Sequence, residues 1–192
     1  MKYFFFFLFF LLHHSVYAQV NISVEWKSNI SISHGDTLFY NTGRKLVWPD
    51  FKGRPDNKSI AAAVTSSGFG YTCMMKAKNR VMSINISVYC FYDKVQSWVK
   101  SGMASDYALL HEQHHFDIAY IATCLFINRL KTTTFKMENY AGKLNKIYDE
   151  CYDEMEKMQN DYDCQTKNGQ LKNIQREWNN KIDGQLASIP ID

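Results

Sequence analysis

The sequence predicts an α+β fold in which an N-terminal antiparallel β-sheet with a hairpin precedes a helical half. Up to residue 92, hydrophobic and polar residues alternate in short runs, whereas from residue 93 the hydrophobic residues recur at three- and four-residue steps. Strands followed by helices are typical of α+β domains. The 192 residues carry a formal net charge of +3 with both signs interspersed, so a nucleic-acid-binding protein is not expected.

The first 18 residues have the layout of a secretory signal peptide. Lys2 precedes an unbroken apolar run over residues 4–12, and Val16 and Ala18 stand at the −3 and −1 positions of the expected cleavage site. A membrane anchor is the alternative, but this run is less than half of the ~20 residues that span a bilayer. We therefore expect residues 19–192 to form one exported domain, periplasmic or extracellular, without a transmembrane segment.

The N-terminal half of this domain is predicted to consist of strands. Alternation is clearest over residues 82–92, and it also occurs over residues 22–26. Residues 61–75 are predicted to be extended and, with a polar connection over residues 76–80, to form an antiparallel hairpin with 82–92. A further short strand is predicted over residues 45–48, before a loop marked by proline and glycine residues.

The C-terminal half is predicted to form three helices. The first runs from a cap at Ser105 or Asp106 to about residue 131, where three threonines interrupt the pattern. The second covers about residues 137–165 and ends before an Asn-Gly pair, and the third covers about residues 171–186.

The first predicted helix contains the motif H-E-x-x-H, as HEQHH over residues 111–115. The four-residue spacing places the imidazoles of His111 and His115 one turn apart on one face, where both can bind one Zn²⁺. Glu112 can accept a proton from a metal-bound water. A polar patch on a half-buried helix is the alternative, but three histidines within five residues favour a metal site. His114 is expected to lie beside the ligands or to face solvent.

A catalytic zinc normally has three protein ligands and a water. Ile118 and Ile121 stand where the metzincin motif requires a glycine and a histidine, so that class is excluded. A carboxylate on the next helix is the other common solution. The candidates are Glu138, Asp153, Glu154 and Asp163.

Three motifs give the chain a resemblance to a known family. They are WPDFKG at residues 48–53, LHEQHHFDI at 110–118 and YDxxTxNG at 162–169. Through them the chain resembles, from about residue 45 to 182, bacterial secreted proteins of unknown function that are often described as zinc-dependent proteases. The helix motif with its trailing Phe-Asp-Ile is the most specific. The resemblance implies a zincin-like domain that hydrolyses peptide bonds with a zinc-activated water.

Two positions depart from the family pattern. A Glu is common where this chain has Tyr120, and a His is common where it has Asn168. If that histidine is the third ligand, this chain has lost it, whereas with Asp163 as the ligand the site is intact. We favour Asp163 because a carboxylate completes H-E-x-x-H sites and the neighbouring Tyr162 hydroxyl could stabilise an oxyanion. A helix-end Asp beside a packing Tyr is the alternative.

The sequence therefore predicts a secreted zinc metallopeptidase, with His111, His115 and Asp163 as metal ligands and Glu112 as the general base. The expected substrates are peptides or proteins, with cell-wall peptides as a variant of the same chemistry. An extended substrate could pair along the edge of the 82–92 strand. The alternative function is a non-catalytic exported metal-binding or envelope-associated protein with a degenerate site, which the two departures favour.

Overall fold

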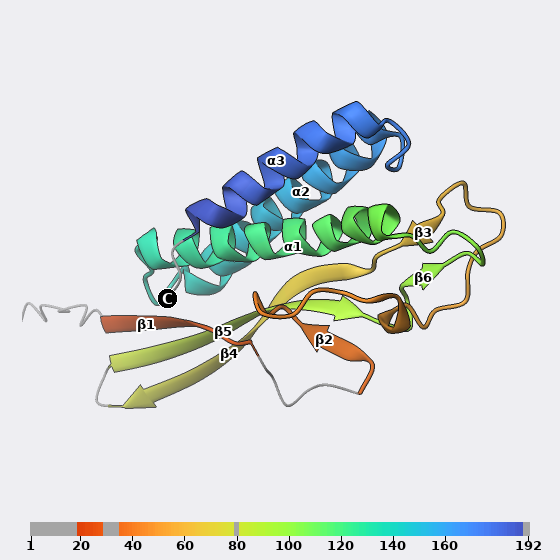
Figure 1. The fold of residues 1–192 in the computed structure, drawn as a ribbon. Helices are drawn as coiled ribbons and strands as arrows, with labels where there is room; N and C mark the ends of the chain where they lie inside the picture. The colour runs from red at the N-terminus through yellow and green to blue at the C-terminus, as the bar shows by residue number, and fades with distance from the viewer. Residues whose placement is uncertain (1–18, 29–34, 79–80, 190–192) are drawn as a thin grey trace, which may run out of the picture.

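The computed structural model describes residues 19–28, 35–78 and 81–189, so the predicted signal peptide lies outside the described residues. Strands precede helices, which confirms the α+β class (Figure 1). In the described part of the chain the elements are β1 (Gln19–Trp26), β2 (Thr37–Phe39), a 3₁₀ helix η1 (Trp48–Asp50), β3 (Ala63–Val64), β4 (Ser67–Lys78), β5 (Val81–Asp93), β6 (Trp98–Val99), α1 (Asp106–Thr132), α2 (Tyr140–Thr166) and α3 (Lys172–Ser188).

Strand β5 is the centre of the main sheet. It pairs antiparallel with β4 from Val81 to Tyr92, which confirms the predicted hairpin. Along its other edge it pairs with β1 in parallel and then with β2 antiparallel. The sheet is therefore mixed, and the prediction of a purely antiparallel sheet was wrong. Because both edges of β5 are paired, the hypothesis that a substrate pairs along this strand is also wrong.

The short strand predicted over residues 45–48 is absent. Leu46 donates its backbone N–H to the Gln113 side chain at 2.7 Å, and Val47 donates its own to Asp50 at 3.1 Å. Side-chain acceptors thus take backbone donors that a strand would pair with a neighbour. Arg44 holds the same Asp50 carboxylate through two bonds of 2.9 and 3.0 Å, and the chain turns into η1.

The extended run predicted over residues 61–75 is divided between two sheets. Its first part, β3, pairs with β6 in a separate two-stranded sheet, and its second part continues as β4 to Lys78. Both parts contact α1 through side chains. The Thr65 hydroxyl donates to the backbone oxygen of Glu112 at 3.1 Å, and the Ser67 hydroxyl donates to that of His115 at 3.3 Å. This segment therefore lies directly against the predicted metal-binding turn.

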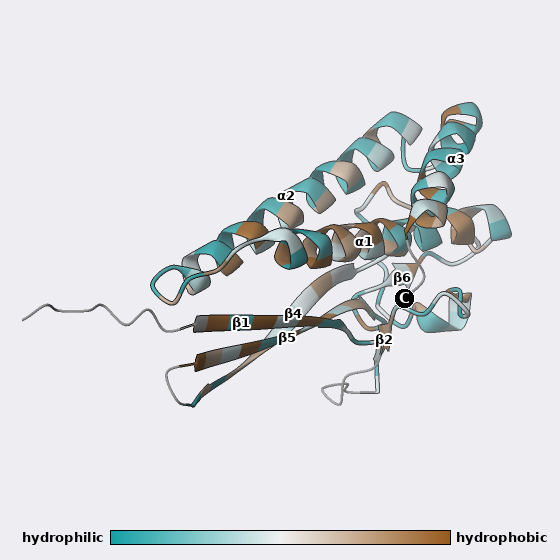
Figure 2. Cartoon of the chain, turned by 90° about the vertical axis from the view of Figure 1, so that its left-hand side faces the viewer, coloured by the Kyte–Doolittle hydropathy of each residue, from teal (hydrophilic) through white to brown (hydrophobic). Residues whose placement is uncertain are grey.

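The three helices lie on one face of the main sheet (Figure 1). Helix α1 packs on the sheet along its length, and the first part of α2 also contacts β4, where the Tyr148 hydroxyl donates to the Phe69 oxygen at 3.3 Å. Helices α2 and α3 are mostly hydrophilic, whereas hydrophobic residues gather on α1 and the strands beneath it (Figure 2). Alternate residues of β5 from Ile84 to Tyr92 face the helices and are at most 1% exposed. Burial of each large apolar side chain there contributes roughly 1.5–3 kcal/mol.

The helix ends agree with the sequence prediction. The hydroxyl of Ser105 caps α1 by accepting from the Ala108 N–H, and α1 ends at Thr132. Helix α2 ends in a left-handed turn, in which Lys167, Asn168 and Gly169 have φ of 51°, 52° and 79°. No helix within the described ranges has an apolar stretch sufficient to cross a bilayer.

Candidate metal centre

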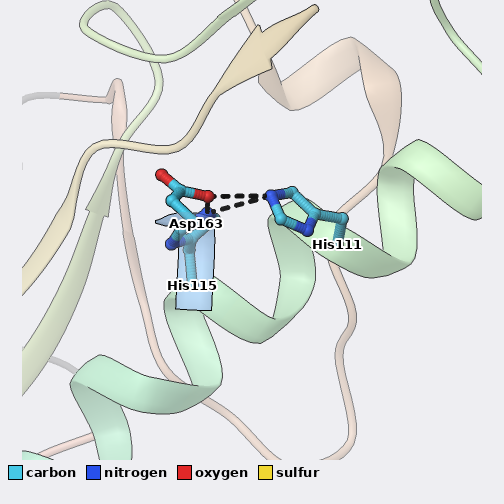
Figure 3. A group of neighbouring side chains, drawn as sticks. All are labelled: His111, His115 and Asp163. Carbon is cyan, nitrogen blue, oxygen red and sulfur yellow. Dashed lines mark hydrogen bonds and ion pairs between the residues drawn. The ribbon is translucent and has the colours of Figure 1, made fainter. Parts of the chain in front are cut away.

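Helices α1 and α2 bring three of the predicted residues together. His111 and His115 lie one turn apart on α1, and Asp163 reaches them from α2 (Figure 3). One carboxylate oxygen of Asp163 is 3.1 Å from the Nε2 atom of each histidine, and the two Nε2 atoms are 3.3 Å apart. The donor atoms all lie within 4.8 Å of one another, so this group could hold a metal ion.

Tyr162 keeps the two helices in register at this point. Its ring stacks on the His111 imidazole with centroids 4.6 Å apart, and it is fully buried. Its hydroxyl accepts from Gln175 at 2.5 Å and faces the His111 carbonyl at 3.4 Å. Burial raises the pKa of this phenol. The hydroxyl does not line the cavity, so the expected oxyanion role is wrong and the packing alternative holds.

Two glutamines that sequence reasoning missed contact the outer nitrogens of the histidines. Gln159, on α2, places Oε1 at 2.5 Å from His115 Nδ1, and Gln175, on α3, places Oε1 at 2.8 Å from His111 Nδ1. A weak signal for Gln159 exists in the sequence, because it precedes Asp163 by one helical turn and shares its face. Gln175 carries no comparable signal.

Glu112 is buried, with 4% of its surface exposed, and lines the same cavity as the three donors. Its Oε2 atom has no hydrogen-bond partner among the described residues. Removing a carboxylate oxygen from water without a partner is costly. A hydrogen-bond donor brought to this oxygen would therefore be stabilising.

The cavity is half-open and has a volume of about 460 Å³. Opposite the metal-binding turn it is lined by residues 61–67, which include β3. The Lys100 N–H donates to the Ala62 oxygen at 2.9 Å, so Ala62 directs its backbone groups toward the β6 side. Because these groups alternate along an antiparallel strand, the N–H and C=O of Ala63 face the opposite edge.

Charges within the group shift the proton equilibria of the metal-free site. Burial alone would lower the pKa of His115, but the hydrogen bond that it donates to Asp163 and the charges of Glu112 and Asp163 outweigh it and raise the pKa to about 9. Burial would raise the pKa of Asp163, but its hydrogen bonds to both histidines hold it well below its usual value. A metal ion that binds here must therefore displace a proton from His115.

His114 does not face solvent. It is 1% exposed, and its Nδ1 atom lies 3.2 Å from the carboxylate of Asp117. Asp117 also accepts from the Tyr40 hydroxyl and the Gln113 amide, both at 2.8 Å. The Phe-Asp-Ile extension of the motif therefore ties the metal-binding helix to the chain that follows β2.

The remaining candidate ligands lie elsewhere. Glu154 pairs with Arg129 at 2.6 Å, and Glu138 and Asp153 are exposed outside the group. Of the two departures, Tyr120 stacks on Tyr40 at 4.0 Å and does not line the metal cavity.

Asn168 lines the cavity and lies in the left-handed turn after α2. Its backbone N–H donates to the backbone carbonyl oxygen of Asp163 at 2.8 Å. Asparagine adopts this conformation more readily than most residues. Asn168 therefore supports the end of the helix that carries Asp163.

Comparison of the chain with protein-family models, with curated proteins and with solved structures gave no significant match. The class of the protein thus follows from its geometry. It is an α+β protein in which two helices bring a His-His-Asp group to the wall of a half-open cavity.

Proposed function

We propose that this protein is a zincin-like, zinc-dependent metallopeptidase. One observation carries the proposal: Glu112 lines the same cavity as the three converging donors, and one oxygen of its buried carboxylate has no hydrogen-bond partner among the described residues. Two histidines and one carboxylate, with a fourth position left for water, form a ligand set of catalytic zinc sites. Imidazole nitrogens favour zinc and its transition-metal neighbours over calcium or magnesium.

His111, His115 and Asp163 hold the ion. A zinc ion held there would lower the pKa of a bound water and polarise the scissile carbonyl. Glu112 accepts a proton from the attacking water as the new C–O bond forms, and it delivers that proton to the amide nitrogen as the C–N bond breaks. Because Glu112 is buried on the wall of a half-open cavity, few bulk waters compete for its oxygen.

The edge of β3 supports an extended peptide as the substrate. The backbone N–H and C=O of Ala63 face away from β6. Ala63 lines the cavity but is only 6% exposed, so a peptide that pairs with it as an added strand must enter the cavity. The neighbouring cavity-lining side chains at 61–63 are all alanine, which leaves room for substrate side chains. This edge replaces the β5 edge that the sequence suggested.

The site of action is also part of the proposal. The signal-peptide layout of residues 1–18 and the resemblance at residues 110–118 support a protein that is exported to the periplasm or beyond. Peptides, proteins and the peptide portions of cell walls are the substrates available to such an enzyme.

The direct test is Glu112→Gln, which keeps the shape of the side chain and removes its basicity. We expect turnover of peptides to fall by at least about 10²-fold, because general-base catalysis contributes that much. Zinc content, measured by elemental analysis, should be unchanged. Glu177→Gln makes the same chemical change at an exposed position of α3 and should leave turnover unaffected.

Unchanged turnover in Glu112→Gln would refute the role of this residue. The second candidate, a non-catalytic exported metal-binding or envelope-associated protein, makes a different prediction. The unmutated chain would then retain zinc but hydrolyse neither a broad peptide library nor peptidoglycan fragments. Hydrolysis of the fragments alone would identify cell-wall peptides as the substrate.

A further inference from the structure

Gln159 contacts His115 twice. Its Nε2 donates to the backbone oxygen of His115 at 2.9 Å, and its Oε1 lies at the Nδ1 atom of the same residue. A carbonyl oxygen only accepts, so the end of the amide that faces it must be the NH₂ group. The other end is then an acceptor, and His115 Nδ1 must carry the proton. Nε2, the atom that faces Asp163, is left to bind the ion.

Gln175 has a different set of partners. It is 2% exposed, and its Oε1 accepts from His111 Nδ1. Its Nε2 lies 2.5 Å from the Tyr162 hydroxyl and 2.6 Å from the side-chain oxygen of Asn179. Tyr162 and Asn179 can both change from acceptor to donor in these hydrogen bonds, because a hydroxyl donates as well as accepts and a rotated asparagine amide offers its NH₂ group.

We infer that Gln159 and Gln175 are positioning residues that direct the two histidine ligands, that Gln159 also fixes the tautomer of His115, and that only an amide can serve at residue 159 whereas a carboxylate can also serve at residue 175. The inference rests on the proposed metal centre but not on peptide hydrolysis.

The different requirements at residues 159 and 175 follow from their hydrogen-bond partners. A glutamate at 159 would direct an oxygen at the His115 carbonyl, and two acceptors 2.9 Å apart repel each other. It would have to turn away and give up the Nδ1 bond. A glutamate at 175 would face three donors after Tyr162 and Asn179 reverse, and a carboxylate behind a ligand histidine raises its basicity.

The experiment measures zinc affinity of the full mature chain by competition with a chromophoric chelator. Gln159→Leu, Gln175→Leu and Gln159→Glu should each weaken binding about 10- to 100-fold, the usual effect of removing an orienting partner. Gln175→Glu should bind at least as tightly as the unmutated chain. Gln96→Glu adds the same charge at an exposed loop position and should bind normally.

Because Gln175 is buried, its substitution can disturb folding as well as zinc binding. A second measurement therefore uses the unmutated chain. A long-range ¹H–¹⁵N spectrum of the zinc-loaded, unmutated chain should show protonated Nδ1 atoms on His111 and His115. Zinc bound through Nδ1, normal affinity in both leucine variants, or equal affinity in the two glutamate variants would overturn the inference. Zinc binding without hydrolysis would overturn only the peptidase proposal, and no zinc binding by the unmutated chain would overturn both.

Discussion

Asp163 is the donor of the metal centre that comes from outside the H-E-x-x-H motif. One of its oxygens contacts both histidines at 3.1 Å, and no other acidic residue joins the group in the described part of the chain. We expect Asp163→Ala to weaken zinc binding by more than about 100-fold, beyond the effect of losing an orienting partner. Equilibrium dialysis followed by elemental analysis measures this.

Asp161→Ala is the matched control for that variant. Asp161 lies two residues earlier on α2, is partly exposed and pairs with Lys157 instead of the histidines. Asn168→Ala tests the position at which the family pattern has a histidine, and it too should retain zinc. Normal zinc content in Asp163→Ala, or its loss in Asn168→Ala alone, would show that the third ligand has been misassigned.

The predictability of the site differs from residue to residue. The spacing of His111 and His115 is a local helical property, so the sequence was sufficient to place them together. Asp163 could only be one of several candidate carboxylates, because its selection depends on how α2 packs against α1. Gln159 has only the weak signal of its one-turn spacing from Asp163, and the role of Gln175 could not be predicted, since a glutamine that orients a ligand looks the same in sequence as one that faces water.

At the scale of elements, the sequence predicted those whose pattern is local. The three helices and the β4–β5 hairpin follow from periodicity and caps, and their ends differ from the prediction by a few residues. The parallel pairing of β1 with β5 was not predictable, since a strand's own alternation does not encode the direction of its neighbour. Strand β2 was missed because its three residues carry too short a pattern.

The loop after η1 has little room for a side chain. A Cβ atom on Gly53 would lie 2.5 Å from the Val95 oxygen and 2.8 Å from the Ser97 oxygen, both of which belong to the backbone. We expect Gly53→Ala to lower the free energy of unfolding by about 1–3 kcal/mol, as overpacking does elsewhere. Urea denaturation followed by circular dichroism measures the change.

Gly184→Ala should have the opposite sign. Gly184 lies within α3, and a Cβ atom added there would meet nothing within 4 Å. Alanine is favoured over glycine inside a helix by roughly 0.5–1 kcal/mol. A destabilised Gly184→Ala variant together with an unaffected Gly53→Ala variant would contradict the packing described for both elements.

At the scale of the whole molecule, the metal centre is where distant parts of the chain meet. Helix α1 carries two of the candidate donors and the proposed base, α2 carries the third candidate donor, and α3 carries one of the glutamines. Thr65, between β3 and β4, donates to the backbone oxygen of Glu112, and Ser67, at the start of β4, donates to that of His115. Removal of the ion is therefore expected to affect the stability of the folded chain as a whole, and zinc binding can be followed through unfolding.

The pH dependence of that stabilisation tests the assembled site. In the metal-free chain, the raised pKa of His115, about 9, means that its protonated form stabilises the fold below about pH 6.5 and that this contribution is lost as the pH rises through 9. The lowered pKa of Asp163 makes its contribution present above its ordinary value, near 3.8, and lost only in stronger acid.

The stabilisation that zinc provides should instead increase as the pH rises, because zinc competes with the proton on His115. Between about pH 6.5 and 9, displacement of one proton strengthens zinc binding by about 1.4 kcal/mol per pH unit. The increase in melting temperature caused by a fixed excess of zinc should therefore be larger at pH 8 than at pH 6.5, as scanning calorimetry of the metal-free and zinc-loaded chain measures. Groups far from the metal centre titrate equally in both forms and cancel in the difference. An increase that is constant or smaller at pH 8 would show that His115 does not exchange its proton for the ion.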